Sequence, residues 1–178
     1  MNVLEAIKAR RSIRAFKNAE VSEESVEKLI DAATWAPSAG NIQPWEFIVV
    51  RKQKTKRELA EAAWNQSLIE EAPVMIVVCA DEVQSARRYG ERGKALYCIQ
   101  DTAAATQNIL LAACSLGLGT CWVGAFKEEE AREALKIPDG LRPVALIPVG
   151  VPAEAPEPRK RKPTNQVIHY DVYKTRKP

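Results

Sequence analysis

The chain has 178 residues, 46% of them hydrophobic and 28% charged, which is the composition of a folded globular protein and excludes a disordered one. The length suits one domain, which we assign to residues 1–178. The formal net charge is only +3, so no overall field calls for nucleic acid as a partner. Basic residues do cluster locally, in a way that suits one or a few phosphates: Arg10, Arg11 and Arg14; Arg87 and Arg88; and Arg159–Lys162.

The numbers of cysteine and histidine residues and the length of the apolar runs exclude further classes of protein. His169 is the one histidine, so a histidine-rich metal site is excluded. The N-terminus lacks the apolar core of a secretion signal, and the longest apolar run, Val74–Ala80, is too short to cross a bilayer. We therefore expect a soluble, cytoplasmic protein without a membrane partner. The cysteines form no C-x-x-C pair and lie in apolar or helical contexts, so we interpret them as small buried hydrophobes: Cys79, Cys98, Cys114 and Cys121.

The first half of the chain predicts alternating helices and strands. Apolar residues at helical spacing predict a helix over 2–9 and another from the N-cap Ser22 towards Pro37. Phe47–Val50 is continuously apolar, which predicts a strand buried on both faces. A helix over 54–64 is expected next, then a polar loop at 64–67 and a second buried strand at Val74–Cys79.

The second half begins with the longest helical pattern, from Gly90 to Leu116. Its part after Asp101 is rich in alanine and uncharged, so we expect a central, largely enclosed helix there. A short strand is expected at 121–123, a charged helix at 127–136 and a last inner strand at Val144–Val149. Helices that alternate with buried strands predict an α/β protein with three layers.

The end of the chain differs in character from the rest. From Val151 onwards, prolines interleave with basic residues, which predicts an extended tail over about 151–178. Its last part, 167–173, has strand-like content but no partner nearby in the sequence. A tail that crosses to a second subunit is one plausible use of such a segment.

The most distinctive stretch is the loop Pro37-Ser38-Ala39-Gly40-Asn41-Ile42-Gln43-Pro44-Trp45. Its two prolines remove backbone donors and fix φ, whereas Gly40 opens conformations that are closed to other residues. Ser38, Asn41 and Gln43 add short polar groups that can donate to the edge of an acceptor-rich ring. We interpret the loop as the wall of a cofactor pocket.

Common catalytic motifs are absent from the sequence. It contains no G-x-S-x-G, no G-x-x-x-x-G-K-[ST] and no H-E-x-x-H, and Gly117-Leu118-Gly119 completes only part of a dinucleotide fingerprint. A bound cofactor would therefore have to carry the chemistry. Arg10, Arg11 and Arg14 repel one another unless an anion or acids neutralise them. From spacing alone, a phosphate clamp and a solvated basic helix end are equally good interpretations.

Four blocks of sequence occur in a fixed order along nearly the whole chain. They are Arg10-Arg11-Ser12-Ile13-Arg14-Ala15-Phe16, Ala36-Pro37-Ser38-Ala39-Gly40-Asn41-Ile42-Gln43-Pro44-Trp45, Leu116-Gly117-Leu118-Gly119-Thr120-Cys121-Trp122-Val123-Gly124, and the tail around Arg161-Lys162-Pro163. Together they resemble the FMN-dependent nitroreductase family. The resemblance implies a three-layer sandwich with a central mixed sheet, and a homodimer with two interfacial FMN sites in which the tail extends onto the partner subunit.

The resemblance assigns the phosphate end of FMN to basic residues. Arg10 and Arg161 would bind the phosphate, with Arg11 and Ser12 beside them, while the rest of Arg159–Lys162 could be a solvated run. Arg14 would lie near N1 and the C2 carbonyl of the flavin, where a fixed cation stabilises the negative charge of the reduced ring.

The flavin ring would be enclosed by three further segments. Asn65, or less favourably Gln66, would bond to the pyrimidine edge, although Asn65 could simply turn its loop. The backbone of Trp122, Val123 and Gly124 would face the central ring and N5, although Trp122 could equally be a core aromatic. The partner subunit would cover the ring with four loop residues: Pro37, Ser38, Ala39 and Gly40.

The implied activity is a ping-pong oxidoreductase reaction. NAD(P)H would reduce FMN and leave, and a nitroaromatic, a quinone or a similar acceptor would then take its place. The alternatives are a flavin-binding sensor without turnover and a specialised reductive dehalogenase of the same superfamily. The chain is short for the family and lacks a long insertion between its central helices, so the resemblance implies no particular acceptor.

Overall fold

A four-stranded sheet forms the centre of the protein. The computed structural model describes residues 1–174, and its strands lie in the order β1-β2-β4-β3, with every ladder antiparallel. The parallel component of the expected mixed sheet is confined to an isolated bridge between Ser12 and Thr120. The strands are β1 (Trp45–Val50), β2 (Val74–Asp81), β3 (Gly119–Thr120) and β4 (Leu141–Gly150).

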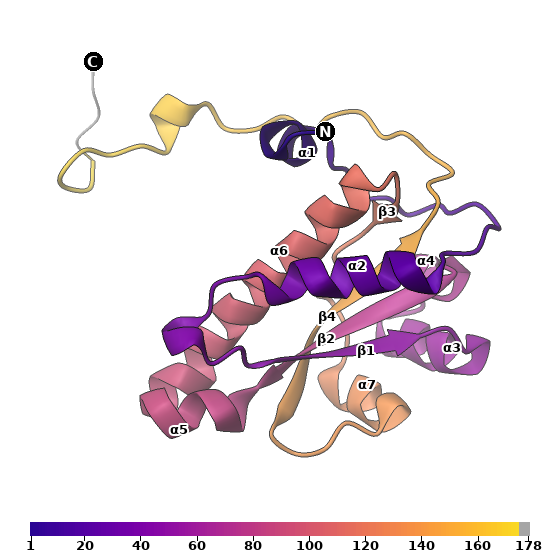
Figure 1. The fold of residues 1–178 in the computed structure, drawn as a ribbon, viewed down its shortest axis with the longest axis horizontal. Helices are drawn as coiled ribbons and strands as arrows, with labels where there is room; N and C mark the ends of the chain where they lie inside the picture. The colour runs from indigo at the N-terminus through magenta and orange to yellow at the C-terminus, as the bar shows by residue number, and fades with distance from the viewer. Residues whose placement is uncertain (175–178) are drawn as a thin grey trace.

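Helices cover both faces of this sheet. The described α-helices are α1 (Val3–Ala9), α2 (Glu23–Thr34), α3 (Gln53–Ala62), α4 (Ser67–Glu71), α5 (Glu82–Arg92), α6 (Cys98–Ser115) and α7 (Glu128–Leu135). Three short segments of other helical type are η1 (Ala39–Asn41), the π-helical η2 (Gly93–Tyr97) and η3 (Thr164–Gln166). Figure 1 shows α2 and α6 on one side of the sheet, and α3 and α7 on the other.

Two hydrophobic clusters follow from the alternation of side chains along the inner strands. Ile76 and Ile147 point to the face covered by α2 and α6, whereas Met75 and Leu146 point to the face covered by α3, α4 and α7. Both faces of β2 and β4 are therefore enclosed, which explains the continuously apolar sequence of Val74–Ala80, where every residue is fully buried. The predicted three-layer α/β fold is confirmed.

The prediction that β1 is buried on both faces was wrong. Val49 is 38% exposed, and Phe47 and Ile48 are only partly buried. The physical reason is position, because β1 is an edge strand that pairs with β2 alone. An apolar run in a sequence does not distinguish an edge strand from an inner one.

The predicted strand at 121–123 is also displaced, because β3 ends at Thr120. The register of β3 on β4 pairs Thr120 with Val149, and the same register is resumed at the isolated bridge between Val123 and Leu146. Between these two pairs Cys121 falls opposite Pro148, which has no N–H to donate. The proline in β4 therefore interrupts the ladder.

The long helical pattern before Leu116 consists of three elements. Helix α5 begins earlier than predicted, at Glu82, where the Asp81 carboxylate accepts a hydrogen bond from the N–H of Gln84 at 2.8 Å. Gly90, with φ 57° and ψ −144°, breaks the regular path, and η2 then leads into α6. As predicted, α6 is central, and eight of its residues are buried.

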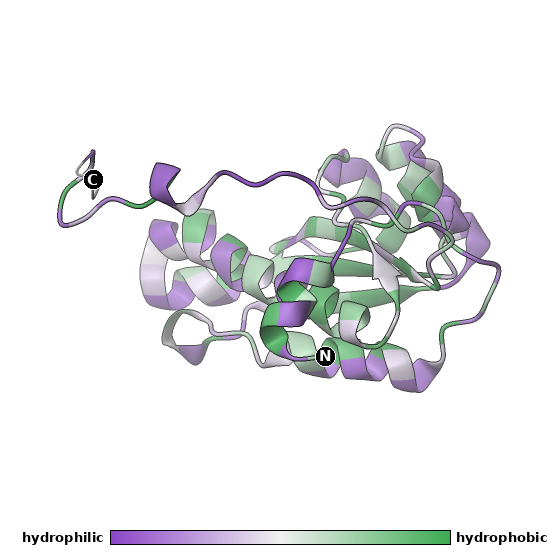
Figure 2. Cartoon of the chain, turned by 90° about the horizontal axis from the view of Figure 1, so that it is seen from above, coloured by the Kyte–Doolittle hydropathy of each residue, from purple (hydrophilic) through white to green (hydrophobic). Residues whose placement is uncertain are grey.

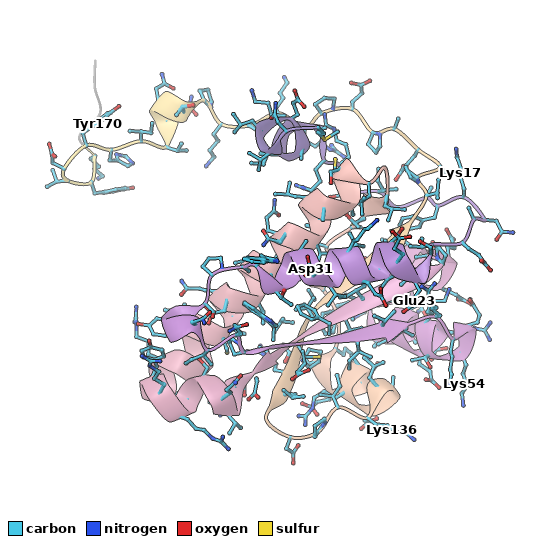
Figure 3. All side chains as sticks on the ribbon, viewed as in Figure 1. Lys17, Glu23, Asp31, Lys54, Lys136 and Tyr170 are labelled. Carbon is cyan, nitrogen blue, oxygen red and sulfur yellow. The ribbon has the colours of Figure 1, made fainter. Side chains whose placement is uncertain are left out.

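The tail from Val151 is extended, as predicted. It runs first beside Ala15–Lys17 and then leaves the body of the molecule, with Tyr170 near its far end (Figures 1 and 3). Figure 2 shows the largely hydrophilic middle of the tail projecting past the helices. The strand-like sequence at 167–173 forms no strand within the described residues, and 175–178 lie outside them. No helix within residues 1–174 is both long and apolar enough to span a membrane.

The two-sided core generates a stability prediction. Leu29 of α2 is fully buried against the sheet, so Leu29→Ala should lower the free energy of unfolding by about 2–5 kcal/mol. Val49→Ala, on the exposed edge strand, should cost less than about 1 kcal/mol. Urea denaturation followed by circular dichroism measures both, and equal losses would contradict the assigned core.

Candidate active site

Basic residues from the two ends of the chain meet in one depression. A hollow of about 440 Å³, which we call the cationic hollow, lies between the end of α1 and the tail. Its lining includes six basic side chains and only one acidic one, Glu157. None of the six forms an ion pair with a carboxylate within residues 1–174. The basic residues are Lys8, Arg10, Arg11, Arg14, Arg159 and Arg161.

Backbone hydrogen bonds hold residues 10–17, which we call the arginine segment, in place. The N–H of Ile13 donates to the carbonyl of Thr120 at 2.9 Å, which fixes the segment against β3. On its other side, the N–H of Lys17 donates to Val151 at 2.8 Å, and that of Ala153 donates to Ala15 at 2.9 Å. The start of the tail is thus bonded along the arginine segment, which brings the later basic residues to the same hollow.

The Glu154 carboxylate adds a further contact to this junction. Its Oε1 accepts hydrogen bonds from the backbone N–H groups of Arg14 and Ala15. It therefore bonds to the backbone beside Arg14 and leaves the guanidinium of Arg14 without an ion pair among the described residues. We did not single out Glu154 from the sequence, because one glutamate in a proline-rich tail carries no local signal.

Arg10 and Arg11 differ in how they are engaged. One Nη of Arg11 donates to the carbonyls of Lys8 (2.7 Å), Ala9 (3.1 Å) and Arg10 (2.9 Å), so Arg11 caps the end of α1. By contrast, the Nε of Arg10 is buried and has no hydrogen-bond partner in the described chain. The helix-end interpretation therefore applies to Arg11, while the buried Nε of the partly buried Arg10 is a donor without an acceptor.

Segments 65–66 and 121–125 contact each other. The Gln66 amide donates to the carbonyls of Ala63 (3.0 Å) and Ala125 (3.2 Å), which ties the polar loop to the segment after β3. Neighbouring Asn65 has φ 58° and is exposed, and its side-chain amide has no hydrogen bond within residues 1–174. Of the two, Asn65 has the side-chain amide without a hydrogen bond among the described residues, and its role toward a ligand remains a prediction.

The three residues at 122–124 are not equivalent. The side chain of Val123 is buried, and its N–H and C=O are both bonded to Leu146, at 3.0 and 2.9 Å. The backbone N–H of Val123 is therefore already paired, and its place facing the flavin remains a prediction. Trp122 is 40% exposed, so it is not the core aromatic of the alternative interpretation. Gly124 is exposed, and its N–H has no partner in the described chain.

The loop Pro37–Gly40 lies at the other end of the molecule, beside α5 (Figure 1). The N–H of Ala39 donates to both carboxylate oxygens of Asp101 at 3.2 Å, and the Ser38 hydroxyl accepts from the N–H of Gln43 at 2.9 Å. Burial raises the pKa of Asp101 although the Ala39 N–H opposes the shift. Within one chain, this loop and the cationic hollow therefore lie far apart. The role expected for Asp101 was only the start of the uncharged stretch, and its anchoring of the loop was missed.

The cysteines are free thiols, and they do not resemble nucleophiles. Burial raises the pKa of Cys79 to about 12 and also raises the pKa of Cys98 and of Cys121. The positive charge of Arg14 opposes the shift at Cys121 without cancelling it. A thiol with a raised pKa stays protonated at neutral pH, which disfavours nucleophilic attack. No group of three or more possible metal ligands occurs within residues 1–174.

The sequence as a whole matches known proteins along most of its length. The sequence model of the Nitroreductase family matches residues 7–71 and 62–151. The chain belongs to the nitroreductase family. This confirms the resemblance carried by the four sequence blocks. The individual site residues assigned from that resemblance remain predictions.

Relatives and solved structures agree with this assignment. The chain is 42% identical over 163 residues to a Methanothermobacter thermautotrophicus protein provisionally named NADH dehydrogenase/NAD(P)H nitroreductase, covering 89% of this chain and 82% of that one. It is 31% identical to the FMN reductase (NADPH) of Bacillus subtilis, covering 97% and 74%. The solved NADPH:FMN oxidoreductase of Vibrio harveyi, complexed with NAD+, superimposes with a TM-score of 0.89 at 29% identity, covering 97% and 78%.

The buried thiols generate a prediction about reactivity. At pH 8 a thiol with a pKa near 12 is ionised in only about one molecule in ten thousand, so Cys79 should be inert to a disulfide reagent such as DTNB. We expect the folded protein to react at no more than one cysteine, the partly buried Cys114, and the denatured chain to react at all four. Cys114→Ser should abolish the folded-state reaction. Rapid modification of Cys121 in the folded protein would contradict this account.

Proposed function

We propose that this protein is an FMN-dependent oxidoreductase that uses NAD(P)H to reduce nitroaromatics, quinones or similar acceptors in a ping-pong reaction. The observation that carries the proposal is the cationic hollow, with its six basic side chains and the unpartnered, buried Nε of Arg10. Buried donors are normally paired, and a phosphate supplies strong, charged acceptors for guanidinium groups. The names of the relatives, FMN reductase and NADPH-flavin oxidoreductase, support FMN as the phosphate-bearing cofactor.

The residues fit the chemical demands of FMN along its length. Arg10 and Arg161 would hold the phosphate, with Ser12 and the backbone end of α1 beside it. Arg14 lines the same hollow and is exposed at its edge, so its charge would lie beside the ring and favour the reduced, negatively charged form. The free amide of Asn65 and the N–H of Gly124 would bond to the ring edges. When bound, FMN supplies the hydride chemistry that the side chains cannot.

The loop Pro37–Gly40 would complete the site from a second chain. It lies away from the hollow of its own chain, anchored to Asp101, and a twofold dimer would bring it to the partner's flavin. Exposed apolar side chains on α1 and on the tail supply surface for such an association: Val3, Leu4, Ile7, Val167, Val172 and Tyr173. With one face of the ring covered, donor and acceptor would use the other face in turn, which is the basis of the ping-pong order.

The first test is spectroscopic. The purified protein, reconstituted with FMN, should show flavin absorbance near 450 nm on the order of one flavin per chain. Anaerobic addition of NADPH or NADH should bleach it, and a nitroaromatic or quinone should restore it. Protein that binds no FMN would overturn the proposal. A yellow protein that neither nicotinamide bleaches would be a flavin sensor, and efficient turnover of haloaromatics alone would indicate the dehalogenase.

A second prediction tests whether the site is shared between chains. Arg10→Ala should weaken FMN binding at the hollow, and Gly40→Val should distort the loop, because φ at Gly40 is +57° and a Cβ there would lie 2.6 Å from the Tyr89 hydroxyl. When the two inactive variants are refolded together, each heterodimer has one site with both halves intact. About a quarter of wild-type activity should therefore return, by random pairing in a twofold dimer.

The control for this experiment uses two variants of the same hollow. Arg10 and Arg161 line one hollow in one chain, so mixing Arg10→Ala with Arg161→Ala should restore no activity. No recovery in the first mixture would show that the loop serves the flavin of its own chain. Recovery in the control mixture would show instead that Arg10 and Arg161 serve different flavin sites. Sedimentation of the flavin-loaded protein as a monomer would lead to the same conclusion.

A further inference from the structure

A cluster of arginine and tyrosine side chains on α5 and η2 has no role in the function proposed above. The rings of Tyr89 and Tyr97 meet edge to face, with their centroids 5.2 Å apart. The Arg88 guanidinium lies 5.6 Å from the centre of the Tyr89 ring, and that of Arg92 lies 5.3 Å from the Tyr97 ring. The Arg92 Nε also donates to the Tyr97 hydroxyl at 2.9 Å. We call these four residues the Arg–Tyr cluster.

Two glycines allow the chain to form this cluster. Gly90 takes φ 57° and ψ −144°, which ends the regular course of α5 directly after Tyr89. The next part of the chain then folds back so closely that a Cβ on Gly93 would lie 2.4 Å from the carbonyl oxygen of Ser85. This return places Tyr97, in the π-helical segment, against Tyr89. π-helical turns are rare and are often found at functional sites.

The cationic side chains of this region are not neutralised. Arg87, Arg88, Arg92 and Lys94 are all exposed, and none has an ion pair within residues 1–174. Of the nearby acids, Glu82 faces Arg142 at 3.9 Å, and Glu91 is exposed and forms no ion pair with another described residue. The cluster therefore presents uncompensated positive charge beside two aromatic rings.

The cluster also touches the loop that we assign to the flavin of the partner chain. Arg88 donates to the carbonyl of Gly40 at 3.2 Å, and a Cβ on Gly40 would lie 2.9 Å from the Arg88 guanidinium carbon. On the proposed dimer, on which this inference rests, a cluster bonded to the covering loop borders the entrance to the flavin. A ligand whose reactive end reaches the ring would then have its other end near these arginines and tyrosines.

We propose that the Arg–Tyr cluster binds the adenosine end of the nicotinamide donor and recognises its 2′-phosphate, so that NADPH is used in preference to NADH. Guanidinium groups bind phosphate with two parallel hydrogen bonds, and Tyr and Arg faces stack on purine rings. The 2′-phosphate is the only group that distinguishes the two donors, and arginines without a carboxylate partner select for it. The cluster is distinct from the cationic hollow, which lies at the other end of the chain fold and serves the phosphate of FMN.

The test compares donors and also measures binding directly. In the flavin-loaded enzyme, Arg92→Ala should lower the ratio of kcat/KM for NADPH to kcat/KM for NADH about tenfold, which corresponds to about 1.4 kcal/mol. The change should lie in KM for NADPH. By calorimetry, the wild-type protein should bind adenosine 2′,5′-bisphosphate about tenfold more tightly than AMP, and Arg92→Ala should remove that difference. Arg92 is the first choice because its side chain contacts Tyr97 and not the flavin loop.

Further variants keep the outcome interpretable. Arg88→Ala should lower the same ratio but should also weaken FMN binding, because it loses the contact with Gly40. Lys54→Ala is the matched control, a lysine on α3 whose label in Figure 3 lies on the opposite side of the molecule from α5, and it should leave the ratio unchanged. An unchanged ratio in both arginine variants, with FMN still reduced, would overturn the cluster's role and leave the proposed function intact. The variants could instead leave the donor ratio unchanged and alter the ratio of kcat/KM for 4-nitrobenzoate to that for a neutral nitroaromatic. That result would also overturn the cluster's role, since the cluster would then select the acceptor.

Discussion

The site depends on a backbone that holds like charges together. Arg10, Arg11 and Arg14 would separate if the chain were free, because each pair of neighbouring cations costs energy in water and more in a partly buried setting. The N–H of Ile13 is bonded to β3, and the residues that follow are bonded to the start of the tail. The sheet and the tail therefore supply the free energy that keeps the hollow cationic. A bound phosphate would remove the repulsion, so cofactor binding and local stability should be coupled.

On the proposed function, one chain contains the parts of the site but does not bring them together. The basic residues of both chain ends line the hollow, and Gln66 ties its loop to Ala125, whereas the loop Pro37–Gly40 is anchored to Asp101 in the first turn of α6. The rigid central helix keeps these groups apart within a chain. Association of two copies is then the simplest way to bring a loop and a hollow together, and the exposed apolar face of α1 is consistent with such a contact.

Local patterns predicted the layers of the fold well and its edges poorly. Val74–Ala80 and α6 were predicted correctly because a segment that is buried on all sides has few charged residues, which can be read from its own sequence. The exposure of β1 and the early end of β3 were missed, because both depend on which strand lies alongside, and that is not encoded in the segment itself. At the candidate site, the motifs singled out the arginines that line the cationic hollow, but the bonds of Glu154 and of the Val123 backbone arise from contacts between distant segments.

Pro148 has a consequence that reaches beyond one missing hydrogen bond. In an uninterrupted ladder, β3 would continue through Val123 and all of its residues would pair with β4. The proline instead ends the regular ladder at Thr120, beside the arginine segment. Pairing resumes at Val123 alone, so Cys121 and Trp122 lie between two paired positions without being part of the strand. Pro148 thus sets the length of β3. A chain with an N–H at this position could pair Cys121 with residue 148 and extend β3 as far as Val123.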